Sequence, residues 1–258
     1  MEKQNNYLNV GKAHQRIIRE KKEQELKGSH SVPQVDIKKA VCKEIDASEA
    51  KKIILEYEWL GKMGSTFMHY GLFFEDVLTC VICLGQFQAP EGYKYYVGEK
   101  YALSGIQLSR GACAYWAHPH SGSKLIGYGL REMKKRGYKY VIAFSDEDAG
   151  EIGTIYQATN WLYLGKRTEK ICDYRIVHKG TKKTFCDTRD MLQRLGFRGV
   201  KKGIKFIEEN PHLEMVFIKP KARYIKLLGN KKENEEMMEI LKDKIKPYPK
   251  RKIENCEE

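Results

Sequence analysis

The chain has 258 residues, of which 41% are hydrophobic, and a formal net charge of +13. That hydrophobic fraction is enough to bury a core, so the composition excludes a disordered protein. The excess of positive charge predicts an anionic partner such as nucleic acid, with general solubility as the alternative. The sequence has no run of about 18 apolar residues, and its start, MEKQNNYLNVGKAHQ, lacks the apolar centre of a secretory signal. We therefore expect a soluble, cytoplasmic protein without a membrane segment.

The seven cysteines are an odd number without a regular spacing, which predicts reduced thiols. Cys80 and Cys83 have the spacing of metal ligands, but the surrounding sequence VLTCVICLGQF has the pattern of a strand. Residues three apart in a strand point to opposite faces of a sheet. We therefore expect two buried strand cysteines rather than a zinc site.

The first part of the chain predicts a basic arm and a linker over residues 1–36. Residues 11–27 are rich in charge and predict either a solvated helix or a basic arm. Residues 28–34, GSHSVPQ, have the composition of a loop. The sequence IKKAVCKEI then alternates apolar residues with lysines, which predicts an edge strand over residues 37–45.

A helix and a hairpin are expected next. Asp46 and Glu49 have the spacing of a capping box, and the apolar residues after them lie on one helical face, which predicts a helix over about residues 47–60. The hairpin consists of two predicted strands, Met68–Phe74 and Val77–Phe87, with Glu75 and Asp76 at the turn.

The central part of the chain predicts alternating strands and helices. A strand is expected within residues 103–117, and a helix begins at Ser121 and stops at Gly137. After this helix we expect a buried strand over residues 138–144, a short helix within 150–159 and a strand over 161–168. Residues 185–228 predict mixed structure that ends in a strand. Residues 229–258 predict a charged tail with one weak helix and a basic cluster.

This order of elements resembles the Gcn5-related N-acyltransferase (GNAT) fold, an α/β (α+β) fold with a mixed central sheet flanked by helices. The resemblance implies a catalytic domain over residues 37–228, in which a central strand splays from its neighbour. It also implies that the start of the following helix faces the donor, because the N–H groups of a helix N-terminus attract anions. In this chain Ser121, Gly122 and Ser123 take that place. Arg110 ends the preceding strand and is expected to hold a phosphate or carboxylate of the donor, with a surface salt bridge as the alternative. The family's glycine-rich signature is absent, so the donor is unknown, with acyl-CoA as the expectation of the fold family.

Three segments resemble the Mom family of phage DNA-modification proteins more closely: HYGLFF, LSRGAC followed by AHPHSGSKLI, and FSDEDAGEIGTIYQATNWLYLG. The resemblance covers about residues 45–224. It implies an enzyme that converts adenine in double-stranded DNA to an N6-carbamoylmethyl (methylcarbamoyl) derivative and so shields the genome from restriction. DNA as the partner accounts for the positive charge, because phosphate contacts dominate affinity for DNA.

The Mom resemblance marks Asp146, His69 and Tyr70 as catalytic candidates, and it implies an iron site to which His69 and Asp146 could supply two ligands. The resemblance to the GNAT fold marks Tyr156 as the tyrosine that protonates the leaving group, because it precedes Asn160 and Trp161 at the spacing of that fold's last helix. A carboxylate at the end of a strand can hold or deprotonate the adenine N6 amine, and a tyrosine can donate a proton. The alternatives are helix capping by Asp146, packing for Tyr156 and a structural hydrogen bond for His69. Trp161 is expected in the core.

The strand near the end of the predicted catalytic domain places basic residues beside aromatic ones, and we predict that Lys219, Lys221, Arg223 and Lys226 contact DNA phosphates. A solvated surface is the alternative. Two other functions remain open: an acyl-CoA-dependent N-acetyltransferase acting on a protein or small amine, and a DNA-binding protein without catalysis. The sequence leaves open whether the protein is a monomer or a homodimer.

Overall fold

The computed structural model divides the chain into two compact units, Met1–Gly165 with Ala222–Glu258, and Lys166–Lys221. The predicted loop at residues 28–34 lies outside the described residues, and the predicted boundaries at residues 36 and 228 remain predictions. The structure describes residues 7–8, 10–25, 36–86, 90–166, 173–181, 184–186, 191–197 and 199–252.

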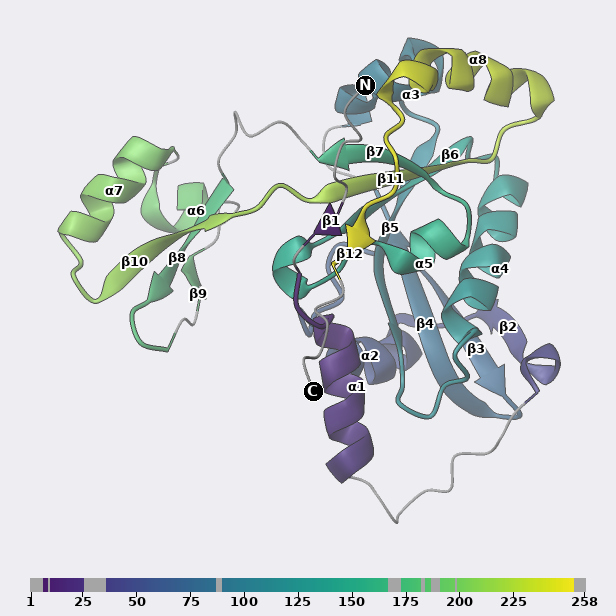
Figure 1. Cartoon of the computed structure of the whole chain (residues 1–258), viewed down its shortest axis with the longest axis horizontal. Helices are drawn as coiled ribbons and strands as arrows, with labels where there is room; N and C mark the ends of the chain where they lie inside the picture. The colour runs from purple at the N-terminus through teal and green to yellow at the C-terminus, as the bar shows by residue number, and fades with distance from the viewer. Residues whose placement is uncertain are drawn as a thin grey trace. The chain divides into compact units, whose positions relative to one another are not determined.

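The first unit is built on a mixed sheet that, in the described part of the chain, has seven strands in the order β2-β3-β4-β5-β6-β11-β7 (Figure 1). The neighbours from β2 to β5 are antiparallel, β5 and β6 are parallel, and β6 and β11 are antiparallel. This order confirms the mixed α/β fold that the sequence predicts. The strands are β2 Val41–Glu44, β3 Met68–Phe74, β4 Val77–Gly85, β5 Gly105–Cys113, β6 Tyr140–Ser145, β7 Leu162–Lys166 and β11 Ala222–Leu227.

Helices cover both faces of this sheet, and each face has its own apolar core. Leu125, Ile126 and Met133 of α4 pack on one face, while Ile53 and Ile54 of α2 pack on the other. Cys80 belongs to the first core and Cys83 to the second, which confirms that these buried cysteines point to opposite faces. The helices of this unit are α1 His14–Glu25, α2 Ala47–Tyr57, α3 Lys94–Val97, α4 Ser121–Lys135, α5 Thr154–Ala158 and α8 Lys231–Leu241, with short 3-10 turns η1 Ile37–Lys39, η2 Pro90–Tyr93, η3 Glu99–Tyr101, η4 Glu147–Ala149 and η5 Lys242–Lys244.

Two local predictions are wrong. Asp46 is the N-cap of α2, but its side chain makes no capping hydrogen bond, so no capping box forms there. The single strand expected at the end of residues 185–228 is two strands in different sheets, β10 and β11. Pro220 lies between them, and a proline has no N–H to donate to a sheet ladder, so the chain can leave one sheet there and enter the other.

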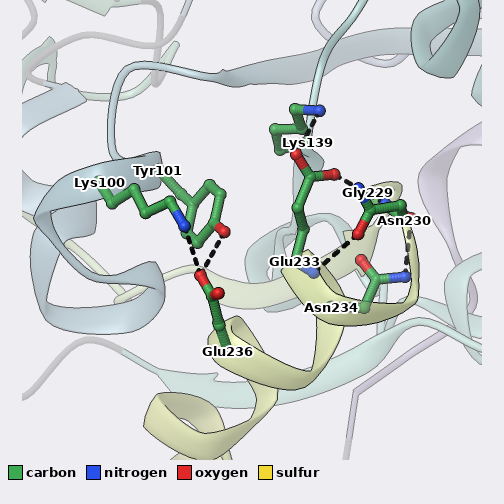
Figure 2. A network of polar contacts seen from close by, with 8 residues as sticks. All are labelled: Lys100, Tyr101, Lys139, Gly229, Asn230, Glu233, Asn234 and Glu236. Carbon is green, nitrogen blue, oxygen red and sulfur yellow. Dashed lines mark hydrogen bonds and ion pairs between the residues drawn. The ribbon is translucent and has the colours of Figure 1, made fainter.

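Residues 231–252, within the predicted charged tail, are part of the fold. The side chains of Met237 and Leu241 of α8 are fully buried against the core, beside α3. Asn230 and Glu233 form a complete capping box at the start of the helix. Figure 2 shows how α8 is also fixed by charge, because Glu236 accepts hydrogen bonds from Lys100 at 2.6 Å and from the hydroxyl of Tyr101 at 2.5 Å. Further along, β12 (Lys250–Arg251) pairs in parallel with β1 (Tyr7–Leu8).

The second unit contains a small antiparallel sheet in the order β10-β8-β9, with two short helices. Its core includes Tyr174, Ile176 and Leu213. In neither unit is any helix of the described residues both long and apolar enough to cross a bilayer. The elements of the second unit are β8 Asp173–His178, β9 Thr184–Cys186, α6 Met191–Leu195, α7 Val200–Glu208 and β10 Leu213–Ile218.

Candidate active site

The parallel strands β5 and β6 pair over a short stretch and then separate. Their register runs only from Gly105 opposite Tyr140 to Leu108 opposite Ala143. Beyond that point β5 continues to Cys113 against β4, and β6 continues to Ser145 against β11. The open edge of β5 is contacted by α1, because the Gln15 amide donates to the Gly111 carbonyl at 2.9 Å. The divergence matches the splayed central strand that the fold resemblance implies.

Asp146 follows β6 directly, at the carboxyl end of the strand. It is 6% exposed, and its carboxylate accepts a hydrogen bond from the Asp148 amide at 3.1 Å, which caps η4. The turn then closes through the Glu151 amide, which donates to the Asp146 carbonyl. The capping role is therefore present. This hydrogen bond is to Oδ1, and a carboxylate can accept several hydrogen bonds.

Residues from the N-terminal and C-terminal parts of the chain, Val10–Lys12 and Arg251, contact the turn after Asp146. Gly150 has a φ of 68°, and a Cβ at that position would lie 2.6 Å from the Lys12 carbonyl oxygen. The Arg251 guanidinium donates to the carbonyls of Gly150, at 2.7 Å, and of Val10, at 2.6 Å. A basic residue that the sequence assigns to a charged tail thus ties three separate segments together beside Asp146.

Tyr156 lies on α5, which begins directly after Gly153. The Tyr156 ring contacts the rings of Trp161 and Tyr224, each with centroids 5.2 Å apart. Trp161 is 0% exposed, so the prediction that it is a core residue is confirmed. Burial raises the Tyr156 pKa, and nearby Glu151 adds to this. The phenol therefore stays protonated at neutral pH and can donate a proton or a hydrogen bond.

The first turn of α4 lies against α5, since a Cβ on Gly122 would lie 3.3 Å from Ile155. Most of its amide groups already have partners. The Ser121 amide donates to the His118 carbonyl, the Lys124 amide donates to the His120 carbonyl, and the Gly122 amide bonds the Cys113 sulfur. The Ser123 hydroxyl also donates to the His120 carbonyl. The amides of Ser121, Gly122 and Lys124 are therefore engaged within the protein.

Two hydroxyls beside the strand divergence are buried without a partner among the described residues. They are Ser121 Oγ, at the start of α4, and Ser145 Oγ, at the end of β6. The two residues are 0% and 1% exposed. A buried hydroxyl without a hydrogen bond lowers the stability of the fold by on the order of 1–3 kcal/mol, so such groups usually bind a ligand or a water. They suit a ligand with neutral hydrogen-bonding groups.

His69 and Tyr70 point to opposite faces of the sheet. Tyr70 is 1% exposed in the core under α4, and burial raises its pKa to about 12. His69 is opposite Cys83, whose side chain is in the core under α2. Its Nε2 lies 3.1 Å from Thr66 Oγ1, and burial lowers its pKa, so the ring stays neutral. The structure does not bring these two side chains together.

Arg110 lies on the same face as His69, because both are opposite Cys83 on the intervening strand. Its Nε donates to the Lys62 carbonyl at 3.0 Å and lies 4.0 Å from the buried carboxylate of Glu58. These contacts tie the loop after α2 to β5. Arg110 is thus already engaged by the protein, on the face opposite to the first turn of α4.

The structure provides no grouping that supports an iron site. Among the described residues, no three or more His, Cys, Asp or Glu side chains gather closely enough to hold a metal. His69 is on β3 and Asp146 follows β6, so two strands lie between them. Three spacings of about 4.8 Å separate their backbones by roughly 14 Å. That separation gives no support for a shared ion.

The four predicted DNA-contacting residues belong to different units. Lys219 and Lys221 are in the second unit, and Arg223 and Lys226 are in the first. The Lys226 ammonium donates to the carbonyls at the end of α5, at 3.1 and 2.9 Å, so it stabilises that helix end. The Arg223 guanidinium lies 5.0 Å from the centroid of the Tyr96 ring. Arg223 and Lys226 therefore make contacts within the first unit.

Sequence reasoning missed Gln15, Ser145 and Arg251 as residues near this site. Gln15 and Arg251 reach the site through packing of segments far apart in the chain, so no local pattern marks them. Ser145 directly precedes Asp146 in the quoted motif, and that adjacency was the available signal. Gly153 had a signal, because the glycines within the predicted short helix indicate a special backbone conformation. Its φ is 71°, and a Cβ there would lie 2.4 Å from the Tyr224 ring.

Comparison with known proteins gives a family match. The model of the Mom protein family matches residues 39–250. The methylcarbamoylase Mom of Escherichia phage Mu is 26% identical over 196 residues, which is 73% of this chain and 74% of that protein. Solved structures that align include aminoglycoside 6'-acetyltransferase type Ii, with a TM-score of 0.40, 11% identity and coverage of 74% of this chain and 99% of that chain. The ribosomal-protein-S18-alanine N-acetyltransferase of Escherichia coli aligns with a TM-score of 0.39 and 8% identity over 74% of this chain and 97% of that chain.

Proposed function

Because the chain belongs to the Mom protein family, we propose that it is a phage-type DNA modification enzyme. It converts adenine in DNA to an N6-carbamoylmethyl derivative and thereby protects that DNA from restriction. The family match over residues 39–250 is the observation that carries this proposal. The relative in phage Mu is a methylcarbamoylase, and the net charge of +13 suits a polyanionic substrate.

The proposed chemistry centres on Asp146 and Tyr156. The Asp146 carboxylate accepts a hydrogen bond from the adenine N6 amine and takes its proton as the new bond forms. Tyr156, kept protonated by its raised pKa, donates to the group that leaves. Because N6 faces inward in a duplex, the adenine must be unpaired or flipped out to reach these residues.

For the group donor we propose only a chemical class. An acyl-CoA remains the expectation of the fold family. Attack of N6 on its carbonyl carbon would release the CoA thiolate and give an N6-acyladenine. In the carbamoylmethyl product, by contrast, a CH2 carbon is bonded to N6, so this product needs a donor that presents a CH2 carbon to N6. The partner-less hydroxyls of Ser121 and Ser145 support binding of a neutral polar portion of a donor near the strand divergence. Arg110, whose guanidinium is occupied by Lys62 and Glu58, is less suited to hold the donor directly than the sequence suggests.

Mass spectrometry of nucleosides tests this function directly. Plasmid DNA from cells expressing the protein is digested and compared with DNA from cells carrying the empty vector. We expect a deoxyadenosine with the mass of the N6-carbamoylmethyl derivative only in the expressing cells. Unmodified adenine in well-expressing cells would contradict the proposal, and acetylated protein or amine in the same cells would favour the acetyltransferase alternative.

A further inference from the structure

The positive charge of the chain is concentrated in the second unit. Residues 166–221 contain 15 Lys and Arg against 7 Asp and Glu, a net charge of +8 out of the +13 of the whole chain. The remaining 202 residues therefore have a net charge of only +5. A charge of this density on a small unit creates a strong local field that attracts polyanions.

The packing of α7 determines which of its residues face solvent. Gly203 is buried against the small sheet, because a Cβ there would lie 2.6 Å from both Met215 and the Tyr174 hydroxyl. The Tyr174 hydroxyl also donates to the carbonyl of Gly199, the N-cap of α7, at 2.8 Å. The absence of a side chain at residue 203 thus lets the helix lie close to the sheet on one side.

The opposite side of α7 is basic and exposed. Lys201, Lys202 and Lys205 are all exposed, together with Ile204. We call these three lysines the α7 lysine face. The helix has nine residues, which corresponds to a length of about 13 Å at 1.5 Å per residue. The three lysines span four residue steps of the helix, about 6 Å, and lysine side chains are long and flexible, so their ammonium groups can each reach a different phosphate of a nucleic-acid backbone.

The order of charges along α7 is unfavourable for the helix itself. Lys201 and Lys202 are in the first turn, which has no acidic residue, while Glu208 is the last residue of the helix. Cations near a helix N-terminus and anions near its C-terminus both oppose the helix dipole, by about 0.3–1 kcal/mol each. Lys205 lies in the last turn, where a cation is favourable for the helix. Helix stability therefore does not explain the positions of Lys201 and Lys202, whereas contact with an external anion does.

We propose that the second unit is a DNA-docking module and that its α7 lysine face binds the phosphates of duplex DNA. The choice of DNA rests on the proposed function, in which DNA is the substrate. Lysine ammonium groups contact phosphates without reading bases, so the docking is independent of sequence. It holds the duplex while the first unit performs the chemistry on one adenine.

The test is a salt series of DNA binding with K201A/K202A/K205A. Binding of the full-length protein to a fluorescently labelled duplex is measured by anisotropy from low to high salt. We expect the slope of log affinity against log salt to fall by about two to three units, since each lost phosphate contact removes about 0.9. A matched control, K39A/K51A/K52A, removes three exposed lysines of the first unit and should keep the wild-type slope.

Alanine favours helices, so the α7 variant should fold, and its melting temperature checks this. A second variant with glutamine at the same three positions keeps the side-chain length and should show the same loss of slope. A wild-type slope in both folded variants overturns the docking surface. Nucleoside mass spectrometry of the wild type separates the two proposals. If the wild type modifies adenine but the lysine variants keep the wild-type slope, only the docking is refuted. If the lysine variants lose slope but the wild type leaves adenine unmodified, only the proposed function is refuted.

Discussion

The two units differ in how they use their residues. The first unit has a sheet with apolar cores on both faces and about one excess positive charge for every 40 residues. The second has a small core and about one excess positive charge for every seven residues. The first can therefore hold buried groups at fixed positions, while the second presents charge to solvent. Our proposal that catalysis and DNA docking belong to different parts of the chain rests on this difference.

The strongest test of this division is Asp146→Asn, which should separate chemistry from DNA binding. Asparagine still accepts the hydrogen bond of the Asp148 amide that caps η4, so the fold should persist. It cannot take a proton, so we expect adenine modification to fall by about 1000-fold. The salt dependence of DNA binding should stay at the wild-type value.

Asp148→Asn provides the matched control, because Asp148 is exposed and adjacent to the same turn. It should retain modification. If Asp146→Asn keeps wild-type activity, the residue is a helix cap and the proposed base must be found elsewhere.

Tyr156→Phe should affect the first unit alone, with a somewhat smaller effect. The substitution keeps the ring contacts with Trp161 and Tyr224 and removes only the hydroxyl. We expect about a 100-fold lower rate of modification with an unchanged melting temperature. Tyr163→Phe is the control, since the Tyr163 ring contacts the same Tyr224 ring, at 5.1 Å. Equal losses in both variants would show that the effect comes from packing rather than from proton donation.

Gly153→Ala tests whether the first unit depends on fixed geometry around α5. The residue has a φ of 71°, and its new Cβ would lie 2.4 Å from the Tyr224 ring. Backbone strain and the clash together should lower the free energy of unfolding by about 3 kcal/mol. Gly137→Ala, at a φ of 88° with open space around it, should lose only about 1 kcal/mol. Denaturant unfolding measures both, and equal losses would rule out the steric contribution of Tyr224.

The smallest expected effect concerns the charged contacts that hold α8 on the first unit. The Glu236 pKa lies below its usual value because of its hydrogen bond with Lys100. A carboxylate whose pKa is lowered by folding stabilises the protein above its ordinary pKa of 4.5, and this contribution is lost as the pH falls through the lower folded value. Glu236→Gln should therefore lower the melting temperature at pH 7 by a few degrees and reduce the difference between pH 7 and pH 3. Glu239→Gln is the control, because Glu239 pairs with Lys242 on the surface of α8, and it should leave the difference in melting temperature between pH 7 and pH 3 unchanged. If Glu236→Gln also keeps the wild-type difference, Glu236 does not contribute to this pH dependence.

The sequence by itself determined most of the local structure of the first unit. The hairpin, the helix from Ser121 and the core position of Trp161 follow from periodicity and turn residues, which are properties of short segments. Asn160, which follows α5, has a φ of 57°, and asparagine is a residue type that tolerates the left-handed conformation at a helix end. The motif from residue 144 to residue 165 also indicated the family, because its residue types and spacing are local as well.

The tertiary structure decided which of the candidate residues lie together. Adjacent residues in a strand point to opposite faces, so His69 and Tyr70 are separated although they are neighbours in sequence. Arg251 and Gln15 reach the site only through strand pairing and packing across most of the chain. The division into two units was equally hidden, since the residues on either side of Pro220 read as one strand until hydrogen bonding assigns them to different sheets. Long-range pairing depends on the whole chain, and a local pattern cannot specify it.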